Sequence, residues 1–153
     1  MSAKFTTTYA CIDSMVAKLQ ADVNLSAVVS IHFPSKVLNY YIGYDEMKLP
    51  LLANAPYLVV MPGGFGRSSD QTMQTHSINM ALVIDKETIT TVNRVSKYTG
   101  IASAEIISKA IDDALKTWIY DNFKEGQEKA RFQITIVVPA IKTTWSYDFQ
   151  DQL

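Results

Sequence analysis

One glycine-rich segment follows a predicted strand and invites a phosphate-binding interpretation: Gly63-Gly64-Phe65-Gly66-Arg67-Ser68-Ser69. A Walker loop requires a lysine before its serine or threonine and a helix after it. A dinucleotide-binding loop requires G-x-G-x-x-G at the start of a helix. Here an arginine precedes Ser68 at the wrong spacing, and a strand pattern follows. The glycines are therefore predicted to serve turn geometry, because glycine adopts positive φ without strain.

Residues that could act as nucleophiles, bases or metal ligands are few and are not grouped. Neither His32 nor His76 has a cysteine or second histidine at metal-ligand spacing, so each is predicted to be a structural histidine. Cys11 lies near the start of a predicted helix without a base partner, and it is predicted to be a buried small hydrophobe. No G-x-S-x-G motif is present. The sequence thus predicts no enzyme, no cofactor and no metal site.

Two pairs of adjacent acidic residues invite an acid–base interpretation. Asp112 and Asp113 are neighbours in a predicted helix, so their side chains point about 100° apart and cannot act together on one face. Asp45 and Glu46 lie in a tyrosine-rich segment. Both pairs are predicted to be solvated surface charge.

Three tyrosines that crowd one proline-bounded segment are candidates for contact with a macromolecule. Tyr40, Tyr41 and Tyr44 could stack on nucleic-acid bases. A stacking surface normally includes a basic groove, however, and residues 35–50 hold two lysines against two acidic residues. A protein partner is therefore favoured for these tyrosines over a nucleic acid.

Three further residues complete the candidate protein interface. Phe65 and Arg67 would place an apolar anchor beside a guanidinium at an exposed loop tip. Trp145 either caps the core or lies in an interface, whereas Trp118 fits the apolar stripe of a helix and is predicted to be core. The candidate interface residues are Tyr40, Tyr41, Tyr44, Phe65, Arg67 and Trp145.

Composition places the chain among ordinary globular domains. It has 153 residues, 48% hydrophobic and 19% charged, and we expect one domain over residues 1–153. A net charge of −1 argues against a dedicated nucleic-acid binder and leaves little repulsion between copies. One cysteine excludes a disulfide framework within the chain. The sequence shows no signal peptide and no apolar run of about 18–20 residues, so we expect a cytoplasmic protein without a membrane partner.

Apolar periodicity predicts two amphipathic helices. A repeat at i, i+3, i+4 and i+7 predicts the first helix over residues 6–23. A longer repeat predicts the second over residues 103–124, with Ser103 as its N-cap. Residues 25–33 are ambiguous, and their β-branched side chains favour a short strand.

Alternating or continuous apolar runs predict the strands. Four segments show such a pattern: 57–61, 72–85, 132–138 and 143–149. Three connections are long for so small a domain: 34–56, 62–71 and 86–102. The polar residues 150–153 are predicted to fray.

These elements predict an α+β fold, an antiparallel sheet of four to five strands with two helices packed on one face. The strands come in adjacent pairs and the helices do not alternate with them, which is typical of this class. Each helix has one apolar stripe that must be buried against the sheet. The strands 57–61 and 72–85 are expected to pair as a long-looped antiparallel hairpin.

Several segments follow one another in an order shared with a known family. They are an amphipathic helix (Cys11–Leu19), a proline-bounded segment, a strand introduced by Ala55-Pro56-Tyr57-Leu58-Val59-Val60, an alternating strand (His76–Ile84), a helix (Ala104–Trp118) and a closing strand that ends Trp145-Ser146-Tyr147-Asp148. This layout, over nearly the whole chain, resembles the tail-terminator (tail-completion) proteins of long-tailed bacteriophages and prophages. The connection 86–102 is longer than the resemblance leads us to expect.

The resemblance implies a ring, commonly a hexamer, that caps the tail tube and joins it to the head. It implies further copies of this chain, the tail tube protein and head-side connector proteins as partners. The protein would then occur in the host bacterial cytoplasm during assembly and afterwards in the virion tail. No catalytic or binding residue transfers from the family to this sequence.

Two other functions stay open from the sequence. One is a different virion morphogenesis factor, such as a head-closure or minor tail component. The other is a small-molecule binding module without a recognisable catalytic motif, which would need an apolar pocket with convergent polar groups around His76 or Tyr57.

Overall fold

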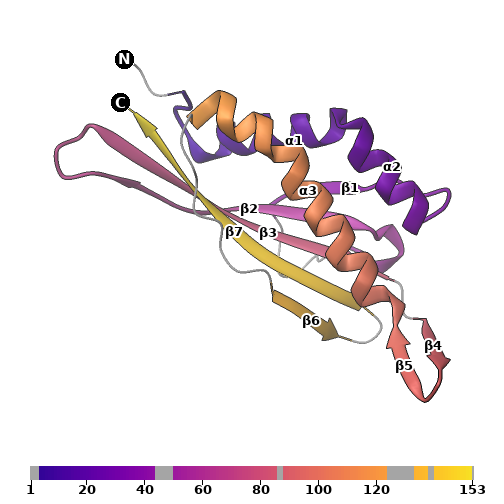
Figure 1. Ribbon diagram of the computed structural model, residues 1–153. Coiled ribbons are helices and arrows are strands. Elements are labelled where there is room, and N and C mark those ends of the chain that lie inside the picture. The colour runs from indigo at the N-terminus through magenta and orange to yellow at the C-terminus, as the bar shows by residue number, and fades with distance from the viewer. Residues whose placement is uncertain (1–3, 44–49, 86–87, 124–132, 138–139, 153) are drawn as a thin grey trace.

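The computed structural model describes residues 4–43, 50–85, 88–123, 133–137 and 140–152, and Figure 1 shows their arrangement. The helices are α1 (Thr8–Ala21), α2 (Val23–His32), the short 3-10 helix η1 (Leu52–Asn54) and α3 (Thr99–Phe123). The strands are β1 (Asn39–Ile42), β2 (Tyr57–Arg67), β3 (Met73–Ile84), β4 (Ile89–Val92), β5 (Val95–Tyr98), β6 (Gln133–Val137) and β7 (Ala140–Gln152).

Five strands form one sheet in the order β1-β2-β3-β7-β6, and β4 and β5 form a separate hairpin. The predicted α+β class is correct. The sheet is mixed, however, because β1 runs parallel to β2 while the other neighbouring strands are antiparallel. This parallel edge strand lies inside the segment 34–56, which the sequence predicted to be irregular. Its run of aromatic and β-branched residues suits an extended backbone.

The three α-helices lie on one side of the five-stranded sheet (Figure 1). Strand β3 supplies the centre of the helix-facing core, because His76, Ile78, Met80, Leu82 and Ile84 alternate with more exposed residues and are all buried. The opposite face of the sheet carries a smaller apolar cluster of Ala55, Tyr57, Val59 and Val83.

Residues 25–33 form most of a helix, α2, and not the short strand that their β-branched side chains favoured. Asp22 caps this helix by accepting a hydrogen bond from the Leu25 N–H at 2.8 Å. Leu25 and Val29 are four residues apart on one helical face and are almost fully buried. Burial of two such side chains outweighs the helix-propensity cost of β-branching, which is at most about 0.7 kcal/mol per residue.

The predicted loop 62–71 is mostly strand, because β2 continues to Arg67 and pairs with β3. The pairing register shifts between Pro62 and Gly64, which accommodates the proline. Gly64 has a φ of 154°, which side-chain-bearing residues avoid. Antiparallel pairing of the two strands is as predicted, but the turn between them is short.

Two further predictions need correction near the helix α3 and the C-terminus. The connection 86–102 contains the β4–β5 hairpin, and α3 begins at Thr99, so Ser103 is buried inside the helix and is not its N-cap. The C-terminal residues 150–152 continue strand β7 and do not fray. Asp151, near the end of this strand, is buried.

Candidate functional site

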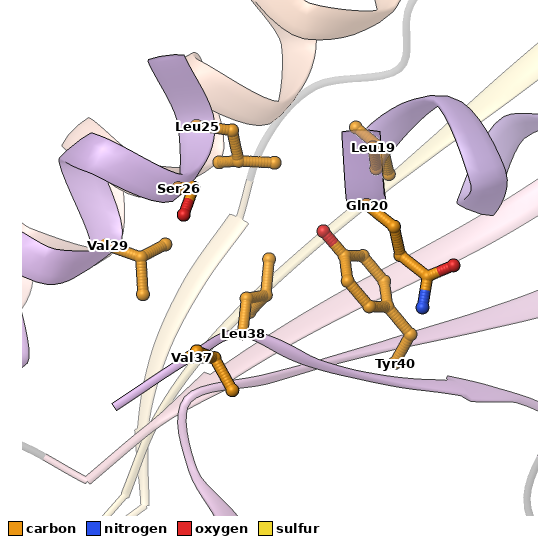
Figure 2. Close-up of a pocket in the computed structure, with 8 residues that line it drawn as sticks. All are labelled: Leu19, Gln20, Leu25, Ser26, Val29, Val37, Leu38 and Tyr40. Atoms are coloured by element: carbon orange, nitrogen blue, oxygen red, sulfur yellow. The ribbon is translucent and has the colours of Figure 1, made fainter. Parts of the chain in front are cut away.

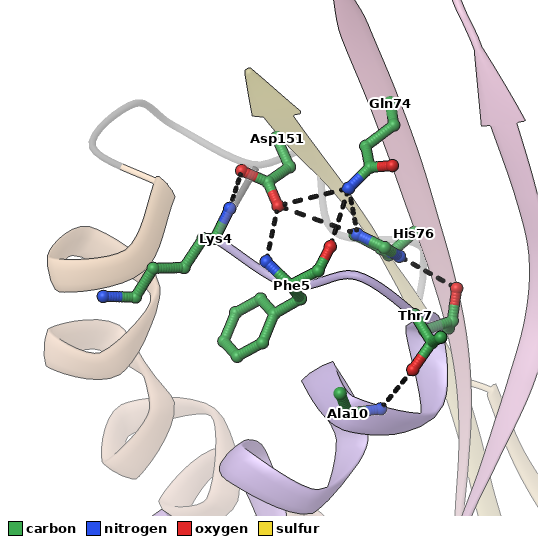
Figure 3. Close-up of polar contacts among 8 residues, drawn as sticks. Lys4, Phe5, Thr7, Ala10, Gln74, His76 and Asp151 are labelled. Carbon is green, nitrogen blue, oxygen red and sulfur yellow. Dashed lines mark hydrogen bonds and ion pairs between the residues drawn. The ribbon is translucent and has the colours of Figure 1, made fainter. Parts of the chain in front are cut away.

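A buried polar cluster joins the N-terminal segment to the ends of β3 and β7 (Figure 3). The Asp151 carboxylate accepts hydrogen bonds from both backbone N–H groups of residues 4–5, each at 2.9 Å. The Gln74 amide donates to the carbonyl of the second of these residues at 2.7 Å. The His76 ring lies between β7 and α1, with Nδ1 2.9 Å from Thr8 Oγ1 and Nε2 3.8 Å from Asp151 Oδ2.

The imidazole of His76 lies between the hydroxyl of Thr8 and the carboxylate of Asp151, which is the arrangement of a Ser-His-Asp triad. Burial argues against that chemistry, because His76 is 0% exposed and the other two are 8% and 5% exposed, which leaves a substrate no access. Burial also lowers the pKa of His76 below its ordinary value, despite the opposing charge of Asp151. The cluster therefore acts as a structural clamp on the N-terminal segment.

The other side chains that could take part in a reaction, Cys11 and His32, also have structural roles. Cys11 is fully buried, and burial, with a smaller contribution from Asp151, raises its thiol pKa to about 12, so the thiol is protonated at neutral pH. His32 Nδ1 lies 2.9 Å from Ser103 Oγ and links α2 to α3. Both histidines thus have the structural bonding that the sequence predicted.

Both members of the acidic pair Asp112-Asp113 were predicted to be solvated surface charge, and this holds for Asp113 but not for Asp112. Asp113 makes the exposed contact, an ion pair with Lys116 at 2.7 Å. Asp112 is half-buried instead and accepts a hydrogen bond from the Tyr147 hydroxyl at 2.9 Å, which ties α3 to β7. The pair Asp45-Glu46 lies outside the described residues.

Phe65 and Arg67 lie on the exposed end of strand β2, where β2 and β3 extend as an arm beyond the helices (Figure 1). The Phe65 ring is 53% exposed, and its centroid is 5.7 Å from that of His76, its partner on β3. The Arg67 guanidinium carbon is 5.8 Å from the Phe65 centroid, a cation–π distance. The two candidates therefore do present a ring and a guanidinium side by side, on a strand instead of a loop tip.

The tyrosine candidates are divided between the two faces of the sheet. Tyr40 and Tyr41 are consecutive in β1, so their side chains point in opposite directions. Tyr40 packs on the helix-facing core, and burial, with a smaller effect of the Asp22 charge, raises its pKa. Tyr41 packs edge-on against Tyr57 with centroids 5.5 Å apart. They do not form one stacking surface, and Tyr44 lies outside the described residues.

Trp145 belongs to the helix-facing core. It is 4% exposed and pairs with Met80 in the β3–β7 register. Of the two interpretations that the sequence left open, the structure therefore places this residue in the core, where another protein cannot reach it in the folded chain.

The structure exposes two apolar surfaces that sequence reasoning did not identify. Every strand residue of the β4–β5 hairpin is exposed, and Val92 and Val95 at its tip are 68% and 54% exposed. Helix α2 has no acidic or basic residue apart from its terminal histidine and exposes Val23 and Ile31 at 79% and 75%. A sequence signal existed for each: β-branched residues around Asn93-Arg94, and a segment over α2 that has apolar residues on more than one side and almost no charge.

A cavity of about 250 Å³ lies between α1, α2 and the segment that enters β1 (Figure 2). Its apolar wall comprises Leu19, Leu25, Val29, Val37 and Leu38. Its polar groups are Gln20, Ser26 and Tyr40. The volume is below the roughly 300–1,000 Å³ of small-molecule sites. It also lies away from His76 and Tyr57, where the alternative function as a small-molecule binding module would need a pocket.

No group of three or more His, Cys, Asp or Glu side chains within the described ranges could hold a metal ion. Among the helices that the structure describes, none is both long and apolar enough to span a membrane.

Comparison with known proteins gives a likeness of fold. No protein-family model matches the sequence, and no curated protein does. Among solved structures, the chain is similar to one from a particle described as "Virion of native gene transfer agent (GTA) particle". The likeness covers 91% of this chain and 92% of that chain, with a TM-score of 0.58. The sequence identity is 17%, so the two chains share a fold over almost their full lengths.

Proposed function

We propose that this protein is a structural component of a phage-like particle, and specifically a tail terminator whose copies form a ring that caps the tail tube and joins it to the head. The observation that carries the proposal is the likeness to a chain from a gene transfer agent virion, which covers 91% of this chain and 92% of that one. Because the likeness spans nearly all of both chains, it relates two whole subunits and not a shared fragment. The order of segments in the sequence, which resembles tail terminators, is an independent support.

The distribution of apolar surface supports a role in assembly. Large apolar side chains are exposed on several elements, among them Phe65 on the arm, Val92 on the hairpin and Ile31 on α2. The net charge of −1 leaves little repulsion between copies.

The internal geometry favours a mechanical role over a catalytic one. The most triad-like group of side chains is buried, and the cavity suits a side chain better than a small molecule. A ring requires each copy to present two different surfaces at a fixed angle, because heterologous contacts close into a cycle only then. A sheet covered by three helices can fix that angle.

The test is particle shape and mass in solution. Light scattering at several concentrations and negative-stain microscopy should reveal a ring with a central opening, commonly of six copies, that binds the end of purified tail tubes. A protein that stays monomeric at high concentration, alone and with tail tubes, would overturn the proposal. A ring that binds the head-side connector but not the tube would indicate a head-closure component instead.

A further inference from the structure

We infer that the tip of the β4–β5 hairpin of one copy enters the cavity between α1, α2 and β1 of the next copy. This inference rests on the proposed function, since the contact would be the joint between neighbouring subunits of the ring. The two surfaces differ from each other and belong to the same chain. The contact is therefore heterologous, which is the kind that closes into a ring.

The tip of the hairpin, here called the knob, presents a pair of exposed valines beside a tight turn. Its turn residues Asn93 and Arg94 have φ values of 51° and 65°, as the tight type I′ turn of a two-residue hairpin requires. Val92 and Val95 flank this turn, are paired across the hairpin and are mostly exposed. A two-stranded hairpin is marginally stable in water by itself. A partner surface that covers the valines would therefore stabilise it.

The cavity has the size and chemistry of a socket for such a knob. Its volume of about 250 Å³ equals the share of roughly eight water molecules in liquid water, which suits one or two aliphatic side chains. Among the residues that the structure describes, no acidic or basic side chain lines it. Val37 at its edge is 69% exposed, so the socket is open to solvent. Figure 2 shows Gln20 and Tyr40 side by side, where they can bond to backbone groups of an incoming turn.

Charge complementarity favours another copy of this chain as the occupant. Residues 88–99 carry Arg94 and Lys97 and no acidic residue. Asp22 lies between α1 and α2 beside the socket, and its charge acts on the Tyr40 hydroxyl. Asp22 is partly exposed, so a basic residue of the entering hairpin would meet it at the edge of the socket.

Within one copy the hairpin cannot fill its own socket. It connects the end of β3 to the start of α3 and points away from the helical layer (Figure 1). The socket lies on the helical side, at the β1 edge of the sheet. A second copy is therefore the source of the knob.

Disulfide trapping tests the contact directly. One preparation carries Val37→Cys and the other Val95→Cys, and they are mixed at high concentration under mild oxidation. We expect a disulfide-linked dimer from the mixture, little from either variant alone, and a ladder of linked chains from the double variant. The natural Cys11 is 0% exposed and does not compete. Tyr120→Cys, at a position 69% exposed near the far end of α3, is the matched control and should not link to Val95→Cys.

A second measurement uses Val95→Asp, which places a charge in the apolar socket. We expect it to weaken self-association about tenfold or more, with an unchanged circular dichroism spectrum, while Tyr120→Asp leaves association unchanged. Rings without a Val37–Val95 cross-link and without an effect of Val95→Asp would overturn this contact and leave the proposed function standing. Linked open chains without rings would support the contact and contradict the ring. Neither rings nor cross-links would overturn both.

Discussion

Replacement of Asp151 by asparagine should destabilise the fold by about 2–3 kcal/mol. The carboxylate accepts two backbone N–H groups, from Lys4 and Phe5, each at 2.9 Å, and it is almost buried. A hydrogen bond to a charged acceptor contributes about 1.5–3 kcal/mol, and a buried donor left unpaired adds to the loss. Asparagine keeps one acceptor oxygen, so one bond survives while the second N–H faces an NH₂ group. The Phe5 ring still stacks on Trp118, 6.1 Å away, which limits the loss.

Urea denaturation followed by tryptophan fluorescence measures this change. For a chain of this length the expected loss corresponds to a fall in Tm of roughly 4–12 °C. Amide exchange of residues 4–5 should also become faster. Asp148→Asn on the same strand is the matched control, because its exposed oxygen can still accept the Ser77 hydroxyl, and it should cost less than about 0.5 kcal/mol. An Asp151→Asn protein within about 0.5 kcal/mol of the natural one would refute the assignment of this cluster as a clamp.

Three further predictions concern buried or strained positions. Burial holds the pKa of His76 below 6.5, so in acid the unfolded chain binds more protons than the folded chain. The free energy of unfolding should therefore fall as the pH drops below 6.5. Urea titrations of the natural protein and of His76→Gln at several pH values measure this fall. Gly64→Ala should cost about 1–3 kcal/mol in a thermal melt because of its positive φ. Gly63→Ala should cost less, since the atoms nearest to its added Cβ belong to the movable Asn79 amide. Cys11 should resist alkylation at pH 8 until the protein unfolds, and native labelling at the rate of a free thiol would contradict its burial.

The sequence was sufficient where one period dominates a long segment. Strand β3 and helix α3 were predicted because their apolar residues repeat without interruption. Helix α2 was missed because its stability comes from burial of Leu25 and Val29 and from the cap at Asp22, whereas local propensity favours a strand. The end of β2 was missed because Pro62 and two glycines read as a stop signal, although a register shift lets the strand continue.

Predictions of the surface were limited by a different cause. Tyr40 and Tyr41 seemed to belong together because they are adjacent, but adjacency within a strand sends them to opposite faces. Val92 and Val95 were not predicted as surface candidates. An alternating apolar pattern shows which residues share a face of a strand, but it does not show whether another element covers that face. The backbone N–H groups that Asp151 accepts are more than 140 residues away in sequence, so no local pattern could identify them.

The clamp and the proposed joint lie at opposite ends of α3, which allows stability and assembly to be separated. The hairpin leads directly into Thr99 at one end of this helix, and the Phe5 ring packs on Phe123 at the other end, 5.9 Å away. The helix has 25 residues and is therefore about 37 Å long. Loss of the clamp should lower stability without changing the yield of the Val37–Val95 cross-link well below the melting temperature. Val95→Asp should weaken self-association without lowering the free energy of unfolding. A cross-link yield that fell in Asp151→Asn under those conditions would show that the two ends are coupled through the helix.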